Sequence, residues 1–260
     1  MRIATWNVNS ARARIDRITS WLSRSDVDVL AIQETKCRDD QFPALAFEEV
    51  GYEVAHHGTN QWNGVAIASR IGLSSVQIGF PGQPAFRDQL EPRAIGADCG
   101  GVTVWSLYVP NGRTLDDPHY EYKLRWLDAL WDASASWLDA SADRPLALVG
   151  DWNIAPLDED VWDMAVFGNS THVSDPERKA YQRFADLGFS DAVRPFTPGP
   201  GVYTYWDYTQ LRFPRREGMR IDHMLVSSAT HVTGGRIDRD ERKGKGASDH
   251  APVIMDIAVK

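Results

Sequence analysis

The chain of 260 residues is 43% apolar and contains ten tryptophans, which suits one large α/β domain over residues 1–260. Its formal net charge of −8 argues against binding nucleic acid over the whole surface, because counterion release requires Lys or Arg at the phosphates. No apolar run reaches the roughly 20 residues that cross a bilayer, and residues 1–6 lack the apolar core of a signal peptide, so we expect a cytoplasmic monomer.

The first half of the chain alternates short apolar segments with one clear helical period. Residues 2–8 predict a strand, and apolar residues between 11 and 22 then recur every three or four positions, in a helix that Ser10 can cap. A buried strand at 27–32 and a helix at 43–50 are expected next. Short strands with Gly-containing turns follow, which favours antiparallel pairing; they cover residues 52–55, 64–69, 73–78, 94–97 and 102–109.

The second half of the chain opens with a long amphipathic helix at about 119–139 and a buried strand at 146–149. Helices are expected near 158–165 and 177–187. Strands return at 221–226, 231–237 and 252–258. This order predicts an α/β four-layered sandwich, in which two mostly antiparallel sheets pack face to face and helices flank them.

The charge is unevenly distributed along the chain. Residues 201–250 contain nine Lys and Arg against seven Asp and Glu, although the whole chain is acidic. The basic residues form two groups, Arg212, Arg215, Arg216 and Arg220, and then Arg239, Arg242, Lys243 and Lys245. They can present a local basic face, or they can belong to ordinary solvated loops.

Two carboxylates follow apolar strands directly. Glu34 comes after residues 29–33 and Asp151 after residues 146–150, so both emerge where a buried strand meets solvent. Either residue alone is equally typical of a loop cap or an ion pair. Together they indicate a Mg²⁺ site, because Mg²⁺ binds through one or two protein carboxylates, with water and phosphate completing the shell. Glu34 suits a direct ligand, and the same rim gathers Asn7, Asn9 and Asp249.

Asp151 and Asn153 lie two residues apart, so in an extended segment their side chains point the same way. One can accept a proton while the other orients a water molecule. A phosphodiester under attack gathers negative charge on its equatorial oxygens, and the site needs donors aimed at them. We identify His250, Tyr108 and Asn111 as candidate donors.

His250 differs from the other histidines because it follows Asp249 in a loop that enters the last strand. Asp222 begins another buried strand. A carboxylate that accepts a hydrogen bond from one imidazole nitrogen fixes the ring and favours the imidazolium.

Seven motifs, in order, resemble those of the exonuclease III family of apurinic/apyrimidinic endonucleases, within the endonuclease/exonuclease/phosphatase superfamily. They span essentially the whole chain. Single motifs such as Gly-Asp-x-Asn or Ser-Asp-His recur across the superfamily, whereas the full series is specific to its DNA-repair branch. The motifs are residues 3–9 (IATWNVN), 33–36 (QETK), 108–111 (YVPN), 150–154 (GDWNI), 206–208 (WDY), 220–222 (RID) and 248–253 (SDHAPV).

The resemblance implies a metal site that holds one or two Mg²⁺ ions, with Mn²⁺ as a possible substitute. Glu34 would be the direct ligand, and the neighbouring metal-site residues would be Asn7, Asn9, Asp151 and Asp249. It also implies catalytic roles. Asp151 would deprotonate or align the attacking water, and Asn153 would orient water and phosphate. The scissile phosphate would be contacted by His250, paired to Asp222, and by Tyr108 and Asn111.

The implied reaction is hydrolysis of double-stranded DNA on the 5′ side of an abasic nucleotide, leaving a 3′-hydroxyl. Relatives usually combine it with 3′-to-5′ exonuclease, 3′-phosphatase and 3′-phosphodiesterase activities. Departures from the family pattern leave the balance among these activities open. Asn111 stands where bacterial exonuclease III has Gln, and the segment 112–118 is short. Tyr205 also replaces a Trp of that enzyme.

Damage recognition is expected from the loop around residues 203–221. Its aromatic and apolar residues resemble the wall that receives an extruded, baseless sugar. The wall residues are Tyr205, Trp206, Met219 and Ile221, with ordinary core packing as the alternative for the two aromatic residues. Phosphate contacts, which position DNA without reading its sequence, are expected from Lys36, Arg93, Arg113 and the arginines of 212–220.

Two other functional classes are consistent with part of this pattern. A phosphatase or sphingomyelinase of the superfamily would share the Glu, Asp-x-Asn and Asp-His groups but would lack the 206–208 and 220–222 motifs. A nucleic-acid-binding relative without activity should have lost a metal-binding or basic carboxylate. Glu34, Asp151 and Asp222 are all present, which argues against that reading.

Overall fold

Side chains of the central strands alternate between two apolar environments, as the period of two along a strand requires. In β1 (Arg2–Asn7), Ile3 packs between the two sheets, whereas Ala4 and Trp6 pack beneath helix α1 (Ala11–Ser25). In β8 (Leu146–Asp151), Val149 faces the other sheet. The computed structural model, which describes residues 1–141, 143–168 and 170–258, therefore has one core between its sheets and one on each outer face.

Each sheet has six strands. The first has the order β11-β12-β1-β2-β4-β3, and the second has the order β5-β6-β7-β8-β10-β9. Most neighbours are antiparallel, but β1 pairs with β2 and β7 pairs with β8 in parallel. The remaining strands are β2 (Val29–Gln33), β3 (Glu53–His57), β4 (Val65–Ser69), β5 (Ser74–Ile78), β6 (Ala94–Cys99), β7 (Val102–Tyr108), β9 (Ser190–Asp191), β10 (Asp222–Val226), β11 (His231–Ile237) and β12 (Val253–Ala258).

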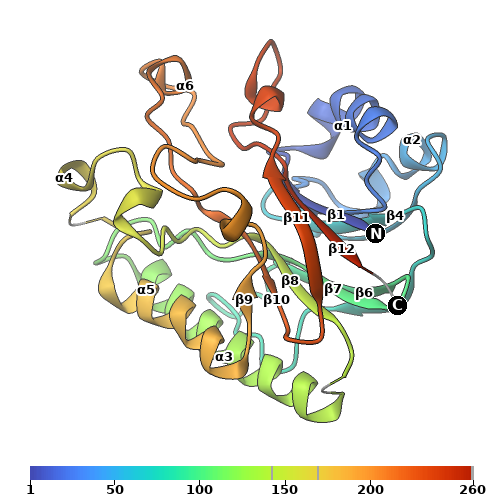
Figure 1. Ribbon diagram of the computed structural model, residues 1–260, viewed down its shortest axis with the longest axis horizontal. Coiled ribbons are helices and arrows are strands. Elements are labelled where there is room, and N and C mark those ends of the chain that lie inside the picture. The colour runs from blue at the N-terminus through green and yellow to red at the C-terminus, as the bar shows by residue number, and fades with distance from the viewer. Residues whose placement is uncertain (142, 169, 259–260) are drawn as a thin grey trace.

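Helices cover both outer faces (Figure 1). Helix α1 and the short α2 (Ala44–Glu48) lie on the first sheet, and α3 (Pro118–Ala140) and α5 (Asp175–Gln182) lie on the second. Helices α4 (Met164–Phe167) and α6 (Arg212–Arg215) lie in the loops between strands. The 3₁₀ turns are η1 (Asp39–Gln41), η2 (Asp158–Asp160), η3 (Arg183–Leu187), η4 (Arg194–Phe196) and η5 (Arg239–Arg242).

The predicted four-layered α/β sandwich is confirmed, with differences in detail. The helix expected near 158–165 is broken into η2 and α4, because Val161 is extended and forms a β-bridge with Met219. The helix expected at 177–187 begins at Asp175, where Ser174 caps it, and continues as η3. The sequence missed β9 and α6, which are only two and four residues long.

Two further features are the lengths of the apolar helices and the state of the two cysteines. Within the described residues, no helix is both long enough and apolar enough to span a bilayer. Cys37 and Cys99 are buried free thiols.

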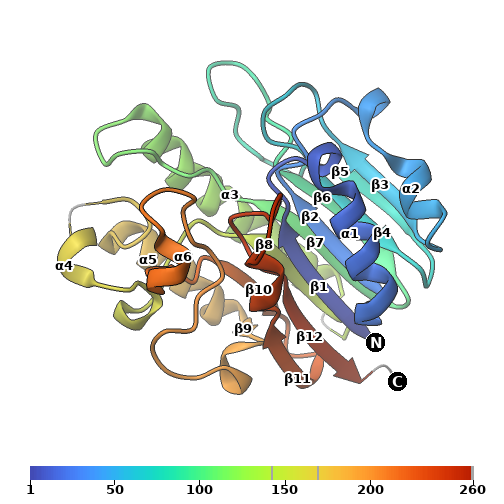
Figure 2. The ribbon, with the colours of Figure 1, turned by 90° about the horizontal axis from the view of Figure 1, so that it is seen from above.

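The inner faces of the strands become polar toward one end of the sandwich. Along β1 the residues facing the other sheet are Ile3, Thr5 and Asn7. The amide of Gln33 accepts a hydrogen bond from Thr5 Oγ1 (3.1 Å) and donates one to Ser106 Oγ (2.9 Å), which joins β1 and β2 to β7 of the opposite sheet. The core therefore ends in a buried polar layer, and beyond it lies the rim formed by the ends of the strands. Figure 2 shows the start of β1 and the end of β12 at the opposite end of the strands.

One contact in the second sheet gives a test of its packing. Gly96 is the direct neighbour of Trp105 across β6 and β7, and Trp105 stacks on Trp137 of α3 with the ring centroids 4.4 Å apart. A Cβ atom at position 96 would lie 2.6 Å from the Trp105 ring. Gly96→Ala should therefore lower the free energy of unfolding by about 1–3 kcal/mol, as overpacking of a core does.

Urea unfolding measures this change. Combining Gly96→Ala with Trp105→Leu should cost less than the sum of the two single changes, because the smaller side chain removes the clash. Strict additivity of the two changes would show that the Trp105 ring does not limit position 96.

Candidate active site

The candidate site is built at the rim from inner-face positions of both sheets. Asp151 ends β8, where its neighbours across the strand pairs are Tyr108 of β7 and Asp222 of β10. Asn7 ends β1 of the opposite sheet, and its Nδ2 donates to Asp151 Oδ2 at 2.9 Å. The last residue of a strand in each sheet thus meets its counterpart across the interface.

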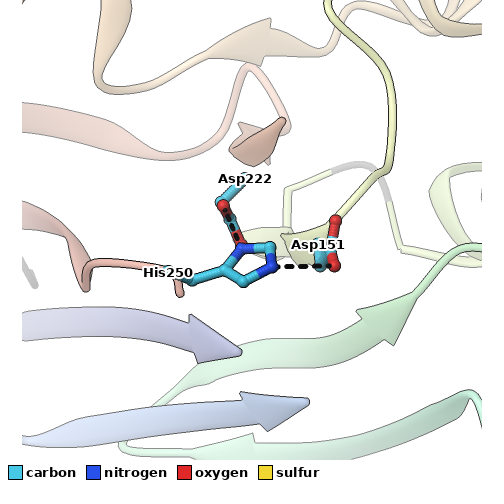
Figure 3. A group of neighbouring side chains, drawn as sticks. All are labelled: Asp151, Asp222 and His250. Atoms are coloured by element: carbon cyan, nitrogen blue, oxygen red, sulfur yellow. Dashed lines mark hydrogen bonds and ion pairs between the residues drawn. The ribbon is translucent and has the colours of Figure 1, made fainter. Parts of the chain in front are cut away.

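His250 lies between two carboxylates (Figure 3). Its Nδ1 is 2.8 Å from Asp222 Oδ2, and its Nε2 is 3.8 Å from Asp151 Oδ2. All three residues are at most 4% exposed. Burial alone would lower the pKa of His250, but the charges of Asp222 and Asp151 outweigh it and raise the pKa to about 10. The ring is therefore held as the imidazolium near neutral pH.

Asp151 has the character of a base. Burial raises its pKa to about 7, against the attraction of His250 and the hydrogen bond from Asn7. Its Oδ1 accepts from the backbone N–H of Asn153 at 2.9 Å, which fixes the carboxylate. A carboxylate with this pKa can take a proton from water near neutral pH.

A second group of oxygens surrounds Glu34, beside the first. Glu34 Oε1 accepts from Tyr108 Oη (2.6 Å) and from Asn7 Nδ2 (3.2 Å), so Asn7 joins Glu34 to Asp151. Burial would raise the pKa of Glu34, but the Lys36 ammonium and the Tyr108 hydroxyl lower it below its ordinary value. The pKa of Tyr108 is raised well above its ordinary value by burial and by Glu34, so the hydroxyl is a donor.

These oxygens fit a hard cation. The Lys36 Nζ lies 2.7 Å from both Glu34 Oε2 and Asn9 Oδ1, so a positive charge already occupies the space between them. Asn9 Nδ2 donates to Asp249 Oδ1 at 3.0 Å, which places a further carboxylate at the same rim. Carboxylate and amide oxygens are the ligands that Mg²⁺ prefers. The oxygen of Asn7 is already used, because its Oδ1 accepts from the Asn9 N–H at 3.0 Å. Its Nδ2 bonds to both Glu34 and Asp151, so Asn7 bridges these two carboxylates.

A second grouping of possible ligands consists of Asp151, Asp222 and His250, whose ligand atoms lie within 4.8 Å of one another. Because His250 Nδ1 is already bonded to Asp222, we interpret this trio as a proton-handling chain. The group around Glu34 fits Mg²⁺ better, since its possible ligand atoms are all oxygens.

Two asparagines form an amide pair next to Asp151. Asn111 Nδ2 donates to Asn153 Oδ1 at 3.1 Å, and Asn153 Nδ2 donates to the Val109 carbonyl at 2.9 Å. Asn153 has a left-handed backbone with φ of 52°. The pair supplies polar amide groups beside the base, where a water molecule or a phosphate oxygen can be oriented.

Two of the four residues predicted to form the apolar wall line a cavity, and the other two are packed in the protein interior. Tyr205 and Met219 line a cavity of ≈ 220 Å³, and the Tyr205 ring centroid lies 4.9 Å from that of His250. Ile221 is 2% exposed and packs behind Met219. Trp206 is 1% exposed and packs against Tyr203 and Ala251, so it belongs to the core and not to the cavity wall.

The expected phosphate contacts also separate into two classes. Arg113 keeps an exposed side chain, and Lys36 is partly exposed with its ammonium bonded to Glu34 and Asn9. Arg93 is 4% exposed, because its guanidinium lies over the Tyr108 ring and pairs with Glu91 at 2.6 Å. Arg220 is likewise buried and donates to the Thr197 carbonyl. Neither guanidinium is presented to solvent: Arg93 supports the Tyr108 ring of the site, whereas Arg220 lies beside Thr197 and Asp191.

Sequence reasoning missed a buried ion pair, Lys123 with Glu177, beneath Asn111 and Asn153. The signal was present: Lys123 falls on the buried stripe of α3, where a charge needs a partner.

Comparisons with known proteins show which proteins this chain resembles. The Endonuclease/Exonuclease/phosphatase family model matches residues 4–250. The chain is 30% identical to exodeoxyribonuclease III of Haemophilus influenzae, over 97% of this chain and 98% of that protein. Two solved structures cover 100% of both chains with a TM-score of 0.93. They are a 3′ phosphatase, NExo, from Neisseria bound to a product DNA hairpin (37% identity), and an AP endonuclease from Archaeoglobus fulgidus (32% identity).

The charge balance around His250 can be tested directly. Asp222→Asn removes the negative charge that most favours the imidazolium, so the pKa of His250 should fall by about 1–3 units. Titration of the ring protons by NMR measures the shift. The matched control is Asp249→Asn, because Asp249 contributes less to that pKa and should move it less. An unchanged titration in Asp222→Asn would show that Asp222 does not hold the charge on His250.

Proposed function

We propose that this chain, which belongs to the exonuclease III branch of the endonuclease/exonuclease/phosphatase family, is a Mg²⁺-dependent DNA-repair nuclease. It cuts double-stranded DNA on the 5′ side of abasic sites and leaves a 3′-hydroxyl. It also removes nucleotides from 3′ ends in duplex DNA and clears blocked 3′ ends as a phosphatase and phosphodiesterase. The relatives support the exonuclease, 3′-phosphatase and abasic-site activities, since they include an exodeoxyribonuclease III, a 3′ phosphatase and an AP endonuclease.

The observation that carries this proposal is the buried chain of Asp151, His250 and Asp222 at the rim. Asp151 accepts a proton from a water molecule, which attacks the phosphorus atom. The bond from phosphorus to the 3′ oxygen of the preceding nucleotide breaks, and that oxygen takes a proton from solvent water to become the 3′-hydroxyl. Because the pKa of Asp151 is about 7, the base is partly ionised at neutral pH.

The phosphate is held by donors on either side of this base. His250, kept as the imidazolium by Asp222, donates to a non-bridging oxygen where negative charge develops. The amides of Asn111 and Asn153 orient the water and the phosphate. The raised pKa of Tyr108 keeps its hydroxyl protonated, so it donates as well.

Glu34, with Asn9 and Asp249, is the set that fits a metal ion, and Asn7 and Asp151 border it. When bound, Mg²⁺ would act as a Lewis acid for the departing oxygen, and Mn²⁺ could replace it. Lys36 bonds to Glu34 and Asn9 in this structure, so it keeps the carboxylate ionised and ready for a cation.

The cavity lined by Tyr205 and Met219 is the proposed place for the extruded abasic sugar. Its position beside His250 allows a sugar in the cavity to present its 5′ phosphate to the reacting groups. Lys36, Arg113 and the exposed Arg215 are the proposed phosphate contacts, and they position the duplex without reading its sequence.

Removing the base should separate cleavage from binding. Asp151→Asn should lower kcat on a duplex with one internal abasic-site analogue by about 10³-fold, within the range for loss of a general base. Its Kd for that duplex should stay within about threefold. The assay uses end-labelled DNA with Mg²⁺, and EDTA gives the blank.

Asp256→Asn is the matched control, because Asp256 pairs with Arg2 at the far end of β12. It should cleave like the wild type. Turnover by Asp151→Asn within tenfold of the wild type would remove Asp151 from the role of base. An intact duplex with a recessed 3′ end, run in parallel, scores the exonuclease activity separately by its product ladder.

Removing the proposed metal ligand should change the metal requirement. Glu34→Ala should raise the Mg²⁺ concentration for half-maximal cleavage by at least about tenfold, because a carboxylate of the site is lost. Glu53→Ala, an exposed change on β3, serves as the control. The same Mg²⁺ titration curve for Glu34→Ala and wild type would assign the metal to other residues.

A further inference from the structure

A fully buried ion pair lies behind the proposed active site. Lys123 of α3 and Glu177 of α5 are both 0% exposed, and their charged groups are in direct contact. Neither residue belongs to the strand-end rim, and the proposed mechanism does not use them. A buried pair of this kind is costly to desolvate and often adds little to stability, so its presence calls for another reason.

The ammonium group of Lys123 is directed at the amide pair. Its Nζ donates to the Asn153 carbonyl at 2.7 Å, to the Asn111 carbonyl at 3.2 Å, and to Glu177. An ammonium has three protons, so all of its donors are used. Two of the three fix the backbone of Asn111 and Asn153, whose side-chain amides form the proposed phosphate-orienting pair.

Glu177 organises a loop around the same carbonyls. It accepts from the backbone N–H of His172 at 2.9 Å and from Thr171 Oγ1 at 2.7 Å. The His172 ring Nδ1 lies 2.6 Å from the Asn153 carbonyl oxygen. Burial would raise the pKa of Glu177, but Lys123 and the neighbouring hydroxyls lower it, so the carboxylate stays ionised.

The backbone held by this pair is strained and tightly packed. Asn153 is left-handed, with φ of 52°. Gly112, directly after Asn111, has φ of 92°, and a Cβ there would lie 2.6 Å from Thr171 Oγ1 and 3.3 Å from Lys123 Cδ. The hydrogen bonds from Lys123 to the Asn111 and Asn153 carbonyls fix this backbone, and with it the two amides that bond to each other and the Asn153 N–H that bonds to Asp151.

We propose that Lys123 and Glu177 are positioning residues that set the Asn111–Asn153 amide pair for catalysis. The inference rests on the proposed function, because it assigns to the ion pair an effect on turnover. The competing explanation is that the pair merely ties α3 to α5. The two explanations differ in which quantity changes when the pair is removed.

The main variant replaces both members, Lys123→Met with Glu177→Leu. Changing both avoids leaving one charge buried alone, and apolar replacements of a buried pair are often neutral for stability. The amide pair should then lose its anchor, and kcat on the abasic duplex should fall about 10–100-fold, since small misplacements at a reacting centre have effects of this size. KM for DNA should change by less than about threefold.

The control is Leu130→Ala on the same helix. Leu130 is buried against the second sheet and belongs to its outer core. This variant should lose stability through a core cavity and keep its kcat at a temperature where it is folded. If the double variant keeps the wild-type kcat, or if Leu130→Ala loses kcat in proportion to its Tm, the positioning role is overturned.

A spectroscopic readout separates this inference from the proposed function. The side-chain NH₂ signals of Asn111 and Asn153 in ¹⁵N NMR spectra report the amide pair whether or not the protein cleaves DNA. They should shift in the double variant and stay unchanged in Leu130→Ala. Unchanged signals in the double variant would overturn the inference. Absence of cleavage by the wild-type protein would overturn the proposed function instead.

Discussion

The constraint on which this structure depends is that the carboxylates of the candidate site are withdrawn from water, so each must find a partner inside the protein. The pairs are Asp151 with Asn7, Asp222 with His250, and Glu34 with Tyr108. In each pair the partner comes from another strand or loop, and two of the pairs cross between the sheets. Burying one carboxylate correctly therefore requires the whole sandwich, and the polar layer around Gln33 is where the two sheets are joined.

The rim also depends on unusual backbone conformations directly after the strands. Asn9, Glu34 and Asn153 all have positive φ, at 46°, 53° and 52°. Such conformations are unfavourable for residues other than glycine and persist only where the surroundings enforce them. Backbone hydrogen bonds supply part of this enforcement: the N–H of Thr35 donates to the Gly64 carbonyl, and that of Lys36 to the Asn63 carbonyl. The turns redirect the chain so that successive polar side chains reach the same space.

The local pattern of apolar residues is enough to predict most strands and helices, and the polar side chains at their ends. The apolar runs before Glu34 and Asp151 place both carboxylates at strand ends, and the structure brings them to one rim. The environment of Arg93 could not be predicted in this way, because its burial depends on a ring fifteen residues away in another strand. The same holds for Lys123, whose partner is 54 residues further along the chain. Residues that contact through tertiary packing leave only a weak local trace, such as a charge on an apolar helix stripe.

The direction of the first and last strands of the chain, β1 and β12, has a practical consequence. β1 begins and β12 ends at the end of the sandwich that lies away from the rim, and the two strands pair directly. A six-residue strand spans about 20 Å, so the start of β1 and the end of β12 are separated from the candidate site by roughly that length. A fluorophore, a purification tag or a surface anchor attached near these strand ends would leave the rim with the candidate site unobstructed, which suits the molecule to immobilised and single-molecule formats.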